Sequence, residues 1–246
     1  MHDFFKRREK KYLITDGQGE ALQKTFDRLK KDQNGEYLVQ NLYYDTANWD
    51  IIRKSMEKPF YKEKLRLRLY GRYTADSKGF LELKKKYDGT VYKRRISFPL
   101  NDLKERCINE IVSSDDSQIS QEIDFFLRNN AVSEKIYIVF KRTAYTCVED
   151  INLRITFDRD IRFSLCSGNN SNFDNYNPEN GVRILKPNQA LMEIKTSCAM
   201  PLWLARILSD NCIYPMSFSK YGVCYAKHIF KCRFQPDNPK EAGDAA

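Results

Sequence analysis

The sequence predicts a single α+β domain built on an antiparallel β-sheet, and three observations lead to that class. Segments in which apolar and charged residues alternate recur along the chain, as in strands with one buried face. Segments with helical spacing of apolar residues are fewer. No repeat or linker divides the 246 residues, of which 41% are hydrophobic. We therefore expect one domain over residues 1–234 and a disordered tail over 235–246.

Alternation is strictest in "KEKLRLRLYG", residues 62–71. A basic residue occupies every second position from Lys62 to Arg68, and leucines occupy the other parity. Such a strand has one apolar face and one cationic face, with like charges about 6.5–7 Å apart. The segments that we predict as strands are, in chain order, residues 5–14, 36–46, 62–71, 79–87, 90–98, 135–145, 152–161 and 190–197. In the segment 135–145 Arg142 shares its parity with three apolar residues, so a bulge or a strand end is expected there.

The remaining segments are predicted as helices and loops. Apolar spacing at Leu22, Phe26 and Leu29 predicts a helix over 16–31. Pro201 suits a first helical position. The other predicted helices are 101–112, 118–129, 201–210 and 219–230. The Asn-rich stretch 166–181 is predicted as a long loop.

The charged strand faces are expected to converge. One alternating strand alone is adequately explained by an ordinary wet surface, but here Arg and Lys dominate these positions in strand after strand. Like charges on neighbouring strands repel, so a sheet that gathers them is expected to hold an anion. Closing the sheet into a barrel would enclose the charges, with the apolar faces packed against helices outside. Three carboxylates, Glu9, Glu82 and Glu193, each stand two residues before a lysine. Carboxylates among the bases suggest a binding site for Mg²⁺ or Mn²⁺. The alternative is that each carboxylate only pairs with its neighbouring lysine.

Composition narrows the classes of function. The net charge of +9 and the pI of about 9.1 favour an anionic partner. There are only two histidines, which makes His-dependent catalysis improbable. The seven cysteines are scattered without a C-x-x-C pair, so reduced thiols in a cytoplasmic protein are expected. No signal peptide or transmembrane run is found.

A series of motifs resembles a known family. "RREKKY", "LRLRLYG", "FLELKKK", "VYKRR", "FKRTAY", "LRITFD", "LMEIK" and "FSKYG" occur in this order between residues 5 and 229. Together they resemble the VTC domain, a branch of the CYTH or triphosphate tunnel metalloenzyme superfamily. The resemblance implies an eight-stranded antiparallel β tunnel with helices outside. It also implies a polyphosphate polymerase, which transfers the γ-phosphate of ATP to a growing inorganic polyphosphate chain with a divalent metal.

The resemblance, together with the strand patterns, gives a set of site residues. Four are expected to be catalytic, namely Lys11, Arg66, Arg68 and Glu193. The expected phosphate-binding residues are Lys84, Lys93, Arg95, Arg142, Arg154, Lys195 and Lys220. Metal binding is expected at Glu193, and less firmly at Glu9 and Glu82. One departure is Ser217, which stands where fungal vacuolar members carry a further lysine.

Two other functions stay open at this point. A tunnel triphosphatase would use the same bases and metal but water as the acceptor. A non-catalytic module that binds polyphosphate or inositol phosphates would need no metal at Glu193. Nucleic acid is not expected as a partner, because no aromatic stacking motif is present.

Overall fold

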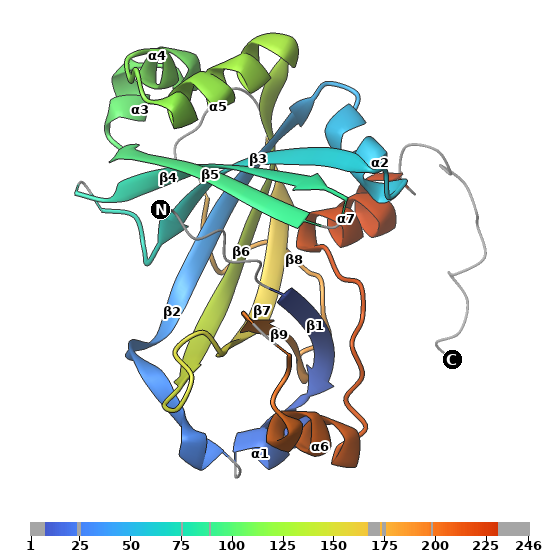
Figure 1. Cartoon of the computed structure of the whole chain (residues 1–246). Helices are drawn as coiled ribbons and strands as arrows, with labels where there is room; N and C mark the ends of the chain where they lie inside the picture. The colour runs from blue at the N-terminus through green and yellow to red at the C-terminus, as the bar shows by residue number, and fades with distance from the viewer. Residues whose placement is uncertain are drawn as a thin grey trace.

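The computed structural model describes residues 8–23, 26–74, 76–88, 90–166, 173, 176–197 and 199–230 (Figure 1). The tail predicted over 235–246 lies outside the described residues, as does part of the loop predicted over 166–181. The described chain alternates long strands with short helices, so the predicted fold class, an antiparallel sheet with an α+β element order, is confirmed.

In the described part of the chain the sheet has nine strands, all paired antiparallel. In chain order they are β1 (Arg8–Thr15), β2 (Leu29–Thr46), β3 (Tyr61–Tyr70), β4 (Lys78–Tyr87), β5 (Thr90–Pro99), β6 (Val132–Cys147), β7 (Arg154–Leu165), β8 (Val182–Arg183) and β9 (Gln189–Thr196). Their spatial order is β1-β9-β7-β6-β2-β3-β4-β5, with the two-residue strand β8 added beside β7. The long strands β2 and β6 therefore join the two halves of the sheet.

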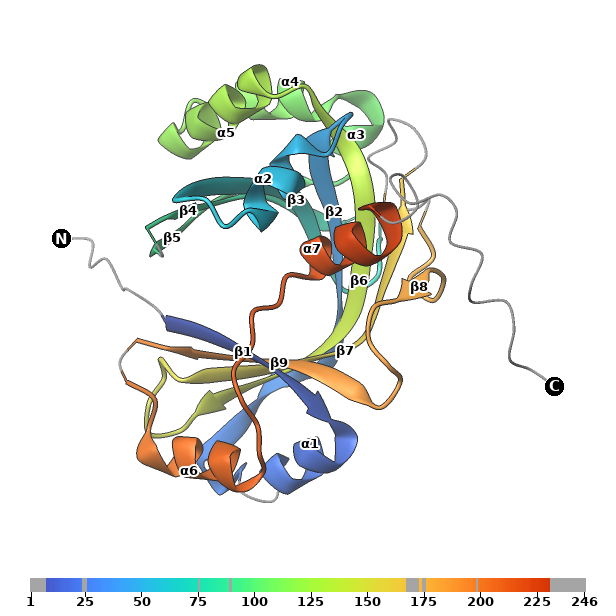
Figure 2. The same ribbon diagram turned by 90° about the vertical axis from the view of Figure 1, so that its right-hand side faces the viewer.

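The sheet is strongly curved. Figure 2 shows β3, β4 and β5 above and β1, β9 and β7 below, connected through β2 and β6. The edge strands of this order are β1 and β5, and in the described part of the chain no pairing joins them to each other. The curve gives the sheet a concave face, onto which the charged parity of β3 and β4 points.

Two clusters of apolar residues cover the convex face. Leucines of β3 and β4 pack against α4 (Ile108–Ser113) and α5 (Gln118–Asn129), next to the short helix α3 (Asp102–Glu105). Residues of β1, β7 and β9 pack against α1 (Asp16–Gln23) and α6 (Leu202–Asp210). The leucine parity of "KEKLRLRLYG" is thus buried in the core, as the alternation predicts.

One helix lies on the concave side instead. Helix α7 (Lys220–Cys224) and the π-helical turn η3 (Tyr225–Phe230) place Tyr221 and Tyr225 in a core cluster with Ile138 and Phe140 of β6 (Figure 2). This explains the parity of Arg142. The Arg142 guanidinium carbon lies 5.1 Å from the centroid of the Phe140 ring, so both side chains face the concave side. The apolar residues of β6 are covered by the helix. The expected irregularity is also present, because the register of β6 with β7 shifts between Val139 and Lys141, whereas its register with β2 is regular from Ile136 to Thr143.

Several boundaries differ from the predicted ones. The helix predicted over 16–31 ends at Gln23, is followed by the 3₁₀ turn η1 (Phe26–Arg28), and gives way to β2, since Leu29 pairs with Cys147 of the long strand β6. The helix predicted over 101–112 is two helices, α3 and α4. Helix α2 (Asp50–Met56) was not predicted; its first turn is held by the Asp45 carboxylate, which accepts from the main-chain N–H groups of residues 51 and 52.

Candidate functional site

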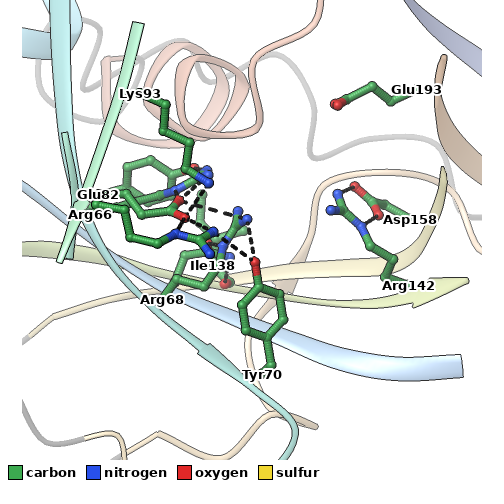
Figure 3. A network of polar contacts seen from close by, with 12 residues as sticks. Arg66, Arg68, Tyr70, Glu82, Lys93, Ile138, Arg142, Asp158 and Glu193 are labelled. Atoms are coloured by element: carbon green, nitrogen blue, oxygen red, sulfur yellow. Dashed lines mark hydrogen bonds and ion pairs between the residues drawn. The ribbon is translucent and has the colours of Figure 1, made fainter. Parts of the chain in front are cut away.

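A buried carboxylate gathers the bases of β3 and β5. Glu82 lies on the concave face of β4, 1% exposed, between its register partners Arg66 and Arg95. Arg66 donates Nε–H and Nη2–H to one carboxylate oxygen at 2.9 and 2.7 Å. Arg95 and Lys93 contact the other oxygen, and Arg68 lies 3.9 Å from the first (Figure 3). Four cations thus surround one anion.

The surplus of charge determines the ionisation of this group. Burial opposes the charged form of Glu82, but Arg66, Arg68 and Lys93 outweigh it and hold its pKa far below the ordinary value. The pKa of Arg66 is raised, since Tyr43 and Glu82 outweigh the effect of burial. Glu82 is therefore ionised at neutral pH, and it favours the charged form of Arg66 beside it.

Neutral side chains orient the arginines, and the sequence analysis did not single them out. Arg66 donates to the Tyr43 hydroxyl at 3.2 Å. Arg68 donates to the Asn41 side-chain oxygen at 2.8 Å and to the Tyr70 hydroxyl at 3.3 Å. Tyr43 and Asn41 come from β2, next to β3 in the sheet. Asn41 and Tyr43 share one parity of β2 with the apolar Val39, so the sequence pattern did not indicate a polar role. That role follows from the register, which places them opposite Arg68 and Arg66.

A second buried carboxylate lies on β7. Asp158 is fully buried and accepts from Arg142 of β6 at 2.6 and 2.8 Å and from Lys220 of α7 at 2.6 Å. Burial opposes its charge, but Lys220 and Arg142 outweigh it and lower its pKa. Figure 3 shows this pair across a shared space from the Glu82 cluster. Asp158 therefore fixes two predicted phosphate-binding residues, although it was not among the predicted site residues.

Glu193 lies beyond this pair on β9. Its carboxylate is 2.6 Å from the Lys195 ammonium, and the same ammonium lies 3.9 Å from Glu9 of β1. Burial opposes the charge of Glu193, but Lys195 and Lys11 outweigh it and hold its pKa far below the ordinary value. The side chain of Thr156 lies beside it, because the two residues are register partners on β7 and β9. The Thr156 hydroxyl oxygen is buried and has no hydrogen-bond partner in the described structure.

The remaining predicted residues lie around these three carboxylates. Lys11 contacts Glu9 at 3.3 Å and donates to the main-chain oxygen of Phe218 at 3.1 Å. Burial lowers the pKa of Lys84, which is also influenced by Glu9 and Lys11 across the concave side. Arg154 is the most peripheral, with its side chain 46% exposed and paired with Asp32 at 2.7 Å. Ser217 is exposed and does not replace the missing lysine.

Comparisons with known proteins agree with this geometry. The family model of the VTC domain matches residues 6–229. The chain belongs to the VTC domain family. A solved structure of a protein from Pyrococcus horikoshii OT3 matches with a TM-score of 0.50 and 14% identity, covering 90% of this chain and 99% of that chain, which shows a shared fold.

A second solved structure has a comparable likeness to this chain. A putative adenylyl cyclase from Hippeastrum, described as having a dominant triphosphatase activity, matches with a TM-score of 0.49 and 17% identity, over 89% of this chain and 94% of that chain. No curated protein matches the sequence. Within the described residues, no helix of this VTC domain has the length and apolar character needed to cross a membrane.

The donors for a metal are few in this VTC domain. Among the described residues, no group of three or more His, Cys, Asp or Glu side chains is placed to hold an ion. The oxygens of Glu82 are taken up by four cations, which favours a role as their counter-ion. Its metal role stays a prediction, as do those of Glu193 and Glu9, which lie within reach of the same ammonium.

Lys64 of this VTC domain gives a pH-dependent prediction. Burial and the neighbouring Lys62, Lys84 and Lys11 lower its pKa from 10.5 to about 7. Between these two values the unfolded chain binds more protons at this position than the folded one, so the contribution of Lys64 to the free energy of unfolding rises with pH. We therefore expect the wild type to gain stability relative to Lys64→Met between pH 7 and pH 10. Urea titrations measure this as a rise in the unfolding free energy of the wild type minus that of the variant.

The matched control is Lys10→Met, because Lys10 is exposed on β1. That variant is expected to follow the wild-type pH profile. Parallel profiles for wild type and Lys64→Met would contradict the shifted pKa.

Proposed function

We propose that this chain is a polyphosphate polymerase, which transfers the γ-phosphate of ATP to a growing inorganic polyphosphate chain. The observation that carries the proposal is the pair of buried carboxylates, Glu82 and Asp158. They hold arginines and lysines from separate strands and from helix α7 toward one concave space. Membership in the VTC domain family supports the same activity. The residues described around this space include many fixed cations but no histidine. Such a site suits phosphoryl transfer, which needs positioning and charge neutralisation more than covalent catalysis by the protein.

The arginines supply directed donors. Three N–H groups of Arg66 bond to Glu82 and Tyr43, which leaves two of its five for a phosphate. Two N–H groups of Arg142 bond to Asp158, which leaves three. Because these carboxylates fix the guanidinium planes, the remaining donors need little reorganisation as charge develops on the transferred group. The terminal phosphate of the acceptor chain attacks the γ-phosphorus, and ADP leaves.

The residues around Glu193 fit a divalent cation. Glu193 and Glu9 both lie near one ammonium, and the orphaned Thr156 hydroxyl faces the same region, so two carboxylates and a neutral oxygen are available. Mg²⁺ and Mn²⁺ are commonly held by one or two carboxylates together with substrate phosphates and water. Held there, the ion would supply positive charge that neutralises the phosphates. Lys11 and Lys195 keep Glu193 ionised and ready to bind it.

The deciding experiment supplies purified protein with ATP and Mn²⁺ or Mg²⁺. The products are separated on a gel for polymer and assayed for free phosphate. Long-chain polymer with stoichiometric ADP is the expected result. Release of phosphate without polymer would assign the triphosphatase reaction instead, and tight polyphosphate binding without any turnover would assign a binding module.

Replacing Glu193 with glutamine is expected to raise the metal concentration needed for half-maximal polymer synthesis by about tenfold to a hundredfold. The substitution keeps the size of the side chain but removes the anion that attracts the cation. Titration of Mn²⁺ into protein with bound tripolyphosphate, followed by calorimetry, gives the same comparison without turnover. Glu20→Gln, on the exposed face of α1, is the matched control. Unchanged metal dependence in Glu193→Gln would remove this residue from the metal site.

A further inference from the structure

Four lysines occupy the concave face where β3 and β4 extend beyond the arginine cluster. Lys62 stands opposite Lys86 and Lys64 opposite Lys84 in the antiparallel register. Like charges directly opposite each other on a sheet are destabilising. The four residues, named here the lysine track, are Lys62, Lys64, Lys84 and Lys86.

The lysine track has no counter-ion in the described structure. None of its four side chains forms an ion pair with a described carboxylate, within the 4.0 Å that defines the other pairs. The convex face of the same strands differs. There, Lys85 and Arg94 both bond to Glu122 of α5 at 3.0 Å. The lack of paired carboxylates is therefore specific to the lysine track and does not extend to the other face of the same strands.

Neutral oxygens orient two members of the track. Lys62 donates to the main-chain oxygen of Ser55 in α2 at 2.9 Å. Lys64 donates to the hydroxyl of Ser219, which caps α7, at 3.2 Å. These bonds position the ammonium groups without neutralising them. Burial, reinforced by nearby cations, lowers the pKa of Lys62 and of Lys64, as expected where positive charge is concentrated without an anion.

The track continues directly from the proposed reaction site. Lys64 is followed two residues later by Arg66, and Lys84 is preceded by Glu82, all on one face. Side chains on one face of a strand are about 6.5–7 Å apart, so the cations from Lys62 to Arg66 extend over about 13 Å. A linear anion that reached the arginines would pass along this row.

We propose that the lysine track binds the part of an inorganic polyphosphate chain that lies away from its reacting end. The proposal rests on the proposed function for the position of that end. The chemistry of the track favours polyphosphate over nucleic acid. From 62 to 66 and from 82 to 86 the concave positions carry only charged side chains, so no ring is available there for a base to stack on.

The test compares the affinities of preformed long-chain polyphosphate and of tripolyphosphate, in the absence of ATP. Lys64→Gln/Lys86→Gln is expected to reduce the ratio of the two affinities by about tenfold, since the short ligand does not extend along the whole track. The slope of log affinity against log salt for the long chain is expected to become shallower by roughly one to two, as two phosphate contacts are lost. Lys10→Gln/Lys54→Gln removes the same charge from exposed positions on β1 and α2 and is the matched control.

Each outcome decides the proposal. An equal loss of affinity for both ligands, or an unchanged ratio, would overturn it. Competition by single-stranded RNA as strong as that by polyphosphate would overturn the choice of ligand. Lys86→Gln alone tests the idea without risk to folding, because Lys86 is exposed and bonds to no described side chain. Since no ATP is used, a chain that binds as expected but synthesises no polymer would reject the polymerase function and keep the track.

Discussion

Replacing Glu82 with glutamine is expected to lower the free energy of unfolding by about 3–5 kcal/mol, the range seen when one partner of a buried ion pair is removed. Glu82 is 1% exposed and is the anion shared by Arg66, Arg68, Lys93 and Arg95. Without it, four cations on neighbouring strands repel each other with little water to screen them. Urea unfolding monitored by circular dichroism measures the loss.

The control for this prediction lies on the opposite face of the same strands. Glu122 also holds two cations, Lys85 and Arg94, but its side chain is 23% exposed. Glu122→Gln is expected to cost less than about 1 kcal/mol, as ion pairs at the surface do. Because an anion that binds only the folded state stabilises it, added tripolyphosphate is expected to raise the unfolding midpoint of Glu82→Gln. An equal loss of unfolding free energy in the two variants would show that the burial of Glu82 does not increase its contribution to stability.

Alternation in the sequence predicts the faces of the strands well. The basic parity of β3 and β4 does lie on the concave face, and the leucine parity does pack under α4 and α5. The reason is that side-chain direction in a strand depends only on the period of two. The pattern also identifies Glu82 as part of the charged face, because the carboxylate and its neighbouring Lys84 share one parity.

Alternation cannot predict which residues from distant parts of the sequence come into contact. Asp158 is separated by 62 residues from Lys220 and by 16 from Arg142. The pairing of β6 with β7 places Arg142 opposite Asp158, and the packing of α7 against β6 adds Lys220. The same packing makes the concave side of β6 apolar at Ile138 and Phe140, where alternation alone predicts an interruption of the strand. A helix inside the curve of the sheet has the same amphipathic sequence as one outside, so periodicity cannot place it.

Replacing Arg66 with alanine is expected to reduce kcat/KM for polymer synthesis at least thirtyfold. Loss of one partner of a desolvated charge pair costs about 2–5 kcal/mol, and each 1.36 kcal/mol is a factor of ten in rate. Arg66→Lys is informative because it keeps the charge but loses the forked donors that bond both Glu82 and a phosphate. We expect it to recover only part of the activity.

The appropriate control is Arg94→Ala, which removes an arginine from the convex face of β5. It is expected to affect stability slightly and kcat/KM little, since its partner Glu122 is on α5, away from the concave side. If Arg66→Ala retains near-normal synthesis while folding as the wild type does, the arginine held by Glu82 does not bind the transferred phosphate. The concave cations would then serve to hold substrate in general, and the directed donors of Arg142 would be the remaining candidates for stabilising the transition state.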